Sequence, residues 1–242
     1  ISKLIGLILP KHNSSLSITL KILNLVQHVE NQALPMSNLV ELVVTKYAFP
    51  QILIQLFKEL AQTHPNEMII DSASSRNCAQ FISTLGRQLP KEVLGNCTIL
   101  MCHLELDPYS MRNAVLDCFG QIVIQVYTKL ELDDVGRKSR DCFLEKLQEH
   151  LHDVNAYVRS HVLQIWMEIS EKKSIPLSRY NTLTCLIVER LRDKSCNVRK
   201  NAASLLLTLI VNNPYSPFLS AEELEKQLTV EGQKSQTISD AT

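Results

Sequence analysis

The sequence is poor in glycine and in aromatic side chains. Among its 242 residues there are 6 Gly, 6 Phe, 6 Tyr and 1 Trp. Sheets depend on tight hairpin turns, and those turns depend on glycine at positions with unusual backbone angles. Leucine, isoleucine, valine and lysine are abundant by contrast. The composition therefore disfavours a sheet protein and predicts an all-α fold.

Neither a charge of one sign nor a long apolar run is present. Lys and Arg together number 25, as do Asp and Glu, so no global attraction to nucleic acid or to an anionic membrane is expected. The run from Leu4 to Leu9 is interrupted by Gly6, whereas a membrane span needs roughly 20 apolar residues. The chain is 45% hydrophobic, which is enough for a sizeable core. We expect no membrane span.

The seven cysteines include no CxxC pair, and their number is odd. Most of them fall at apolar positions of expected helices, which favours a reducing, intracellular compartment over a disulfide framework. The chain starts at Ile1 without the features of a signal peptide. We expect it to be a piece of a longer protein.

Helix start and stop signals recur at short intervals along the chain, and proline often stands where a helix should begin. The segment 155–172 shows the helical pattern well, because Val158, Val162, Ile165 and Ile169 follow the spacing of one helix face. The expected helices are 14–30, 36–48, 50–63, 73–88, 91–104, 108–128, 134–151, 155–172, 178–191, 196–211 and 220–228.

An internal repeat decides the fold. In four places an aspartate at a turn is followed five or six residues later by an arginine in the first turns of a helix. The four pairs are Asp71 with Arg76, Asp107 with Arg112, Asp153 with Arg159, and Asp193 with Arg199. Successive arginines are 36, 47 and 40 residues apart, close to the period of HEAT and armadillo units. The repeat predicts a HEAT/armadillo-type α-solenoid of about five antiparallel helix pairs that share one core.

The repeat also predicts how the chain is divided. Residues 1–48 form a degenerate N-terminal helix pair, and 49–213 form four HEAT-like repeats. Residues 214–242 begin a further unit and end in a polar tail.

The repeated aspartates and arginines have two interpretations. In the structural one, the aspartate accepts backbone N–H groups at the turn and the arginine reaches the aspartate of an adjacent unit. In the functional one, the four arginines form a row that binds a ligand. A charge that repeats with the architecture is more simply part of that architecture, so we favour the structural interpretation.

Basic residues gather toward the end of the repeat region. Between Leu151 and Asn213 there are nine lysines and arginines against five acidic residues. Seven of them cluster at two inter-helix turns: Lys172, Lys173, Arg179, Arg190, Arg192, Lys194 and Lys200. If those turns align along one edge, the residues form a ridge for DNA phosphates or for a protein partner. The alternative is a solvated edge.

Little in the sequence favours catalysis or a cofactor. Cys97, Cys102 and His103 could suggest a thiol beside a base, but neighbouring residues of a helix point to different faces, and no fourth metal ligand is near. No glycine-rich phosphate loop or zinc-protease motif occurs. We expect no catalytic residue, no metal, no cofactor and no small-molecule substrate. A helical enzyme using Cys102 or His103 is the weaker alternative.

Three stretches resemble one family. They are Leu191–Ala202 (LRDKSCNVRKNA), Tyr109–Leu116 (YSMRNAVL) and His152–Gln164 (HDVNAYVRSHVLQ). In this order and at these separations they resemble the D-type HEAT-repeat, non-SMC subunits of condensin I. The resemblance runs from about residue 26 to 230 and is weakest before residue 60.

The resemblance implies a scaffold role in mitotic chromosome condensation. The partners it implies are the kleisin subunit, the SMC subunits that carry the ATPase, and chromatin or DNA, and the implied location is the nucleus and chromosomes, with a cytoplasmic pool. No binding residue carries over, because no family contact motif matches position by position. A HEAT adaptor of transport or phosphatase regulation is the alternative within the same fold.

Overall fold

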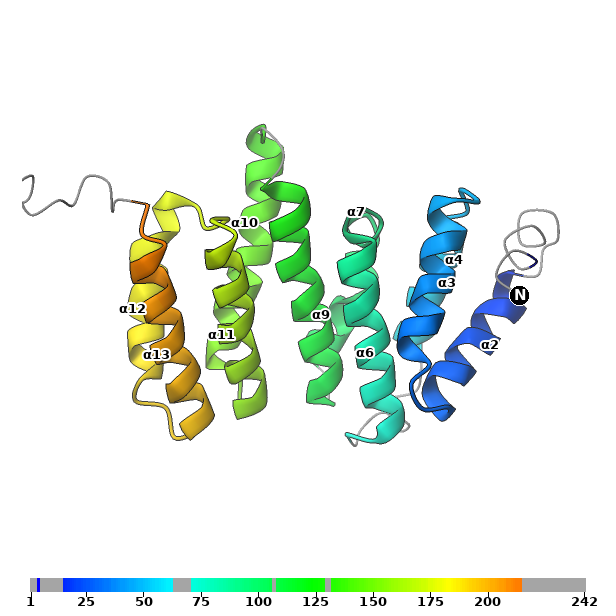
Figure 1. Cartoon of the computed structure of the whole chain (residues 1–242), viewed down its shortest axis with the longest axis horizontal. Helices are drawn as coiled ribbons and strands as arrows, with labels where there is room; N and C mark the ends of the chain where they lie inside the picture. Colours follow the sequence, from blue (N-terminus) through cyan, green and yellow to red (C-terminus); the bar gives the residue numbers. More distant parts are fainter. Residues whose placement is uncertain (1–3, 5–14, 63–70, 106–107, 129–131, 215–242) are drawn as a thin grey trace, which may run out of the picture.

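The computed structural model describes residue 4 and residues 15–62, 71–105, 108–128 and 132–214. Within these ranges the chain is built from helices and turns, with no strand. The helices lie side by side in one elongated stack, and their order along the stack follows their order in the chain (Figure 1).

The helices follow one another with short connections. The longer ones are α2 (Ser15–His28), α3 (Ala33–Thr45), α4 (Gln51–Gln62), α6 (Ala73–Gln88), α9 (Tyr109–Ile122), α10 (Asp134–Glu149), α11 (Ala156–Glu171), α12 (Tyr180–Arg190) and α13 (Cys196–Val211). The shorter ones are α7 (Pro90–Leu94), α8 (Cys97–Leu100), the 3₁₀ turns η1 (Met101–Leu104), η3 (His150–His152) and η4 (Leu177–Arg179), and a π-helical turn η2 (Val123–Tyr127).

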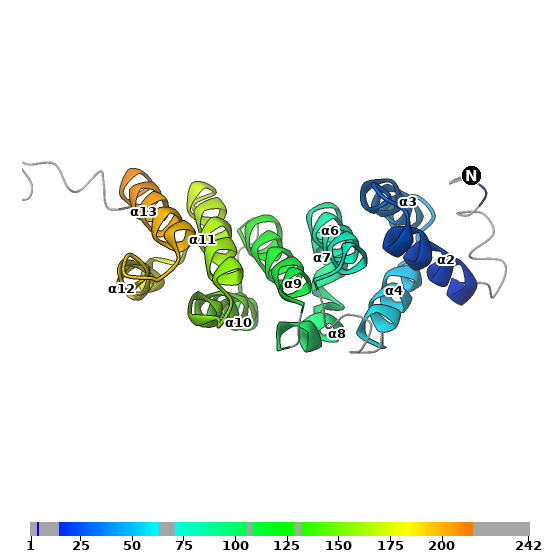
Figure 2. The same ribbon diagram turned by 90° about the horizontal axis from the view of Figure 1, so that it is seen from below.

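The helices form two rows. In one row, α3 packs on α6, α6 on α9, α9 on α11, and α11 on α13. We call this the second-helix row, because each member is the second helix of its pair. The other row holds α4, α8, α10 and α12 (Figure 2). An all-α solenoid of antiparallel helix pairs is therefore confirmed.

The connections lie along two opposite edges. Those within a pair, such as 191–195 between α12 and α13, lie at the lower edge of the view in Figure 1. Those from one pair to the next, such as 172–176 between α11 and η4, lie at the upper edge.

One core runs through the described part of the stack. Phe57, Phe81, Phe119 and Trp166 are fully buried, and each comes from a different helix. Burial of one large apolar side chain contributes about 1.5–3 kcal/mol. Because neighbouring pairs share these contacts, each pair is stabilised by the pairs on either side.

Two glycines bring the second-helix row together. A Cβ on Gly86 of α6 would lie 2.6 Å from the Sγ of Cys118 and 3.1 Å from its Cα. A Cβ on Gly120 of α9 would lie 2.5 Å from Cγ2 of Ile165 in α11. At both positions any larger residue would separate helices that now touch.

The prediction of one helix over 91–104 is wrong. The segment is broken into α7, α8 and η1. Gly95 and Asn96 separate α7 from α8, and the side-chain amide of Asn96 donates to the carbonyl of Glu92 at 2.9 Å, in place of a helical N–H. The helix expected over 36–48 begins earlier, at Ala33. The helix expected over 220–228 lies outside the described residues.

Candidate interaction surfaces

The four repeated arginines occupy the same place in their helices. Arg76, Arg112, Arg159 and Arg199 are each the fourth residue, of α6, α9, α11 and α13 respectively. All four therefore lie in the first turn, near the lower edge.

Two of these arginines reach forward to the aspartate of the next pair. Nη1 of Arg112 lies 2.7 Å from both carboxylate oxygens of Asp153. Arg159 binds Asp193 with two parallel hydrogen bonds, from Nε at 2.8 Å and from Nη2 at 2.9 Å. The side chains of Asp153 and Asp193 are only 6% and 4% exposed. Charge-assisted pairs with so little water access fix geometry strongly.

The same residues also hold their own turns. Nη1 of Arg159 donates to the carbonyls of Asp153 and Val154, and Nη1 of Arg199 donates to those of Asp193 and Lys194. Oδ1 of each aspartate accepts the backbone N–H two residues later. Arg159 and Arg199 therefore each bind the backbone of the turn that precedes their own helix, and Arg159 also binds the aspartate in the turn of the next pair.

The remaining members of the repeat differ. Arg76 pairs with Asp71 of its own turn at 3.1 Å, and its side chain is 57% exposed. Asp107 lies outside the described residues, so the structure does not show what it contacts. Residues that could follow Arg199 in a further unit also lie outside them.

Electrostatics at the Arg159–Asp193 pair follow from its geometry. The hydrogen bonds and the charge of Arg159 hold the pKa of Asp193 below its ordinary value, and those of Asp193 raise the pKa of Arg159. Both side chains are therefore charged at neutral pH.

The structure does not bring the seven basic residues of the predicted ridge together. Lys172, Lys173 and Arg179 lie at the upper edge, around the connection between α11 and α12 (Figure 1). The other four lie at the lower edge, around the connection between α12 and α13: Arg190, Arg192, Lys194 and Lys200. Successive turns of an antiparallel array fall on alternate edges, so these two turns cannot share one.

Two of the seven are occupied by contacts within the chain. Arg179 donates to Oε1 of Gln148 at 3.0 Å and to Oε1 of Glu145 at 2.9 Å. Nη1 of Arg190 donates to the carbonyl of Leu151 at 3.2 Å. Arg179 of η4 and Arg190 of α12 therefore join the α12–α13 pair to the preceding one. The others are exposed: Lys172, Lys173, Arg192, Lys194 and Lys200.

A polar network that the sequence did not reveal links three helices of the second-helix row. Ser83 of α6 donates to Oδ2 of Asp117 in α9 at 2.6 Å, and Nε2 of His161 in α11 lies 2.8 Å from Oδ1 of the same carboxylate. Burial opposes a charge on His161, but the hydrogen bond and the charge of Asp117 outweigh it, so the pKa of His161 is raised. The residues are 34 and 44 positions apart, which hides the network from any local motif.

A groove of about 370 Å³ lies against this network, between α6 and α9. Ser110 Oγ and Asn113 Oδ1 line it, and neither has a hydrogen-bond partner within the described part of the chain. Buried polar atoms are nearly always paired in folded proteins. Both atoms are buried, so the exposed part of the lining is formed by other side chains, Gln80 and Arg87 among them.

Nothing in the described residues resembles an activated nucleophile. Cys97 is buried and Cys102 exposed, and burial raises the pKa of both thiols, the opposite of what a reactive thiolate needs. His103 is buried, which lowers its pKa. Only three of the seven cysteines are buried, fewer than the sequence suggested.

The described residues hold neither a candidate metal site nor a helix that could span a membrane. They contain no group of three His, Cys, Asp or Glu side chains arranged to hold a metal ion. No helix among them has the length and apolar character needed to cross a membrane.

No family model matches this chain. Three similar known proteins are all named as condensin subunits. Over 236 residues, 98% of the chain, it is 39% identical to "Condensin complex subunit 1" of Homo sapiens, and over 231 residues, 96% of the chain, 36% identical to that of Xenopus laevis. The "Condensin-1 complex subunit CAP-D2" of Arabidopsis thaliana is 28% identical over 230 residues, 93% of the chain.

The chain spans 16% to 17% of the length of these relatives. Among solved structures, a designed armadillo repeat protein in complex with peptide (KR)4 aligns with a TM-score of 0.42 and 12% identity, covering 79% of this chain and 91% of that one.

Proposed function

We propose that this chain, whose sequence belongs to the condensin complex subunit 1 family along nearly its whole length, is a helical scaffold segment that holds other subunits of condensin. The observation that carries the proposal is identity of 36–39% over at least 96% of the chain. The proposed setting is the nucleus and the chromosomes, with a cytoplasmic pool.

The solenoid supports a scaffold over an enzyme. Two of its repeated arginines, Arg112 and Arg159, are engaged in stacking one pair on the next. Burial raises the pKa of Cys97, Cys102 and Cys118, and it raises that of Cys78 to about 11. Large, regular faces are what stacked repeats provide for partner proteins.

The groove at Ser110 and Asn113 is the proposed contact for the kleisin subunit. An extended polypeptide offers one N–H and one C=O per residue, and the exposed side chains of Gln80 and Arg87, which line the groove, can pair with these groups.

We do not propose duplex DNA as a partner. The exposed basic side chains are divided between two edges, with Lys172 and Lys173 on one and Arg192 and Lys194 on the other. A duplex that follows one edge would meet only part of them.

Co-precipitation tests the scaffold role. The full chain, tagged and added to mitotic extract, should recover kleisin and SMC proteins. Recovery of transport factors or of a phosphatase instead would support the alternative HEAT adaptor. Asn113→Arg should reduce kleisin recovery by filling the groove, whereas Lys194→Glu, at an exposed position away from the groove, should not. Equal recovery by both variants would place the contact elsewhere.

A further inference from the structure

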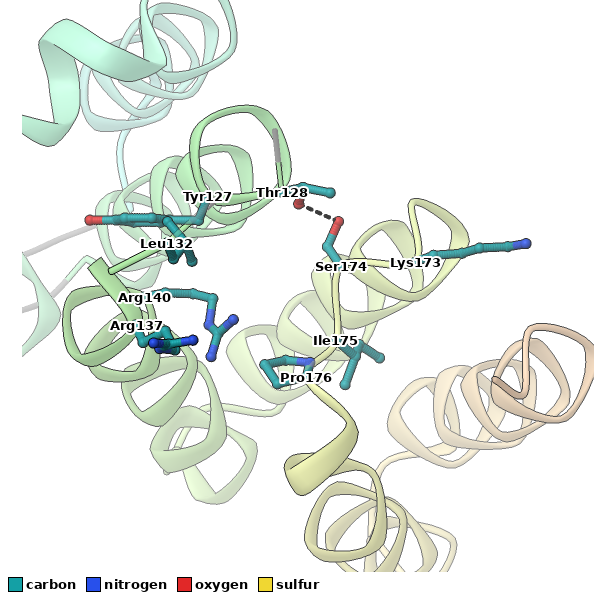
Figure 3. A pocket seen from close by; sticks show the side chains of 9 residues that line it. All are labelled: Tyr127, Thr128, Leu132, Arg137, Arg140, Lys173, Ser174, Ile175 and Pro176. Carbon is teal, nitrogen blue, oxygen red and sulfur yellow. Dashed lines mark hydrogen bonds between the residues drawn. The ribbon is translucent and has the colours of Figure 1, made fainter. Parts of the chain in front are cut away.

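A second hollow lies at the upper edge, between the turn that follows α9 and the turn that follows α11 (Figure 3). Its volume is about 320 Å³. It is lined by Tyr127, Thr128, Leu132, Arg137, Arg140, Lys173, Ser174, Ile175 and Pro176.

Its two sides are tied together by hydroxyl groups. Oγ1 of Thr128 lies 2.7 Å from Oγ of Ser174 and hydrogen-bonds with it. The two residues come from consecutive helix pairs, so this contact closes one side of the hollow. Ile175 and Pro176 form an apolar wall opposite Arg140 (Figure 3).

The charges that line the hollow are all positive. Three of the nine lining residues are cationic and none is acidic. The guanidinium of Arg140 points into the space and Arg137 lies beside it, whereas the side chain of Lys173 extends away from the other lining residues (Figure 3).

Both arginines keep donors available for a ligand. Arg140 binds Oδ1 of Asp141 through Nε and Nη2, at 3.0 and 2.9 Å, which leaves Nη1. Arg137 binds Asp134 through Nη2 alone, at 2.9 Å. Both carboxylates flank the hollow without lining it.

We propose that this hollow binds a phosphate monoester dianion, carried on the side chain of a phosphorylated serine or threonine. A carboxylate has one charge and would compete poorly with Asp134 and Asp141. A phosphate has nearly two charges and three acceptor oxygens, which suit the two guanidinium groups of the hollow. The apolar wall accommodates the carbon atoms of the phosphorylated residue and its neighbour.

The same geometry disfavours a DNA backbone. A duplex presents phosphates in a continuous row, and such a row laid over this edge would meet the carboxylates of Asp134 and Asp141, which are 88% and 36% exposed. A single phosphorylated side chain enters between them. The proposed site is independent of the scaffold function and of the kleisin groove.

The test is a binding titration of the full chain with a short fluorescent peptide that carries one phosphoserine, with inorganic phosphate as a competitor. We expect the unphosphorylated peptide to bind at least tenfold more weakly. Arg140→Gln should weaken binding of the phosphopeptide at least tenfold. If inorganic phosphate binds as tightly as the peptide, the ligand is a free phosphate and the peptide proposal is overturned.

Arg137→Gln separates binding from folding. The ion pair of Arg137 with Asp134 joins side chains that are 57% and 88% exposed, so its loss should cost little stability. This variant should therefore keep the melting temperature while weakening phosphopeptide binding at least threefold. Lys172→Gln is the matched control, because Lys172 is exposed and does not line the hollow.

Three results would overturn the proposal. They are no difference between the two peptides, an equal loss in the Lys172→Gln and Arg137→Gln variants, and tighter binding of duplex DNA that depends on Arg140.

Discussion

At the scale of single residues, Arg159 is the side chain that joins two repeats most directly. It binds both oxygens of Asp193 and two carbonyls of its own turn. Arg159→Ala would leave a carboxylate that is 4% exposed without its closest cation. We expect a loss of about 2–4 kcal/mol in the free energy of unfolding, measured by urea denaturation.

Arg76→Ala is the control for that prediction. The Arg76–Asp71 pair joins residues of one turn and is far more exposed, so its loss should cost at most about 1 kcal/mol. Equal destabilisation by both variants would contradict a special role for the forward pairs. Affinity for partners, per folded molecule, should be unchanged by Arg159→Ala.

His161 should make stability depend on pH near neutrality. Its pKa is raised in the folded chain, so its charged form stabilises the fold fully below the unfolded value of about 6.5. That contribution is lost as pH rises through the folded pKa. Between pH 6 and pH 8 this contribution should therefore fall. Because buried His103 has a lowered pKa and acts in the opposite direction, the contribution is measured as the difference between thermal melts of the native chain and of a variant without the His161–Asp117 pair.

Asp117→Asn is the matched variant for the pH dependence. It keeps the size of the side chain and removes the charge that holds the proton on His161. Glu168 also acts on His161, more weakly, so a small dependence should remain. A fall in stability as steep as that of the native chain would show that another group titrates.

At the scale of helices, Gly86 sets how closely α6 and α9 approach. Alanine is normally the better helix former by about 1 kcal/mol. Here its Cβ would meet the backbone of Cys118 as well as the thiol, and backbone cannot move aside. Gly86→Ala should therefore lower the free energy of unfolding by about 1–3 kcal/mol.

Gly95→Ala provides the comparison. Gly95 has an ordinary helical φ of −63°, and the nearest atom to its added Cβ would be 3.6 Å away. Its substitution should be neutral or slightly stabilising in the same denaturation experiment. Similar losses at both glycines would mean that close packing does not explain the effect at Gly86.

The helices show where sequence reasoning succeeds. The expected boundaries of 73–88 and 196–211 agree with α6 and α13 to the residue, because caps and apolar spacing are local signals. The break at Asn96 depends on a side chain that takes over a helix carbonyl, which glycine and proline spacing does not indicate. Likewise, the sequence predicts Arg179 and Arg190 as DNA or partner contacts, because their partners within the chain lie 31 to 39 residues away and leave no local signal.

At the scale of the whole molecule, the stack should open from its ends. Among the described helices, α13 packs mainly against α11 and α12, whereas α6 has neighbours on both sides. Leu205→Ala, at a fully buried position of α13, should cost about 2–5 kcal/mol. Hydrogen exchange should then become faster in α12 and α13 and remain slow in α6.

Leu85→Ala in α6 is the counterpart in the middle of the stack. Leu85 is also fully buried, but its loss should speed exchange in α3 and α9 together with α6. If either variant accelerated exchange evenly along the chain, the array would unfold as one cooperative unit.

Because Arg112 and Arg159 each contact the aspartate of the following pair, a segment of one repeat length can be deleted while the contacts re-form. Asp193 and Arg199 reproduce the turn contacts of Asp153 and Arg159, one period of 40 residues later. Loss of residues 153–192 would join His152 to Asp193 and would present Arg112 with an equivalent carboxylate. An in-frame deletion or duplication of this length would thus keep the series of forward pairs intact, so such an array can change in length by a whole unit.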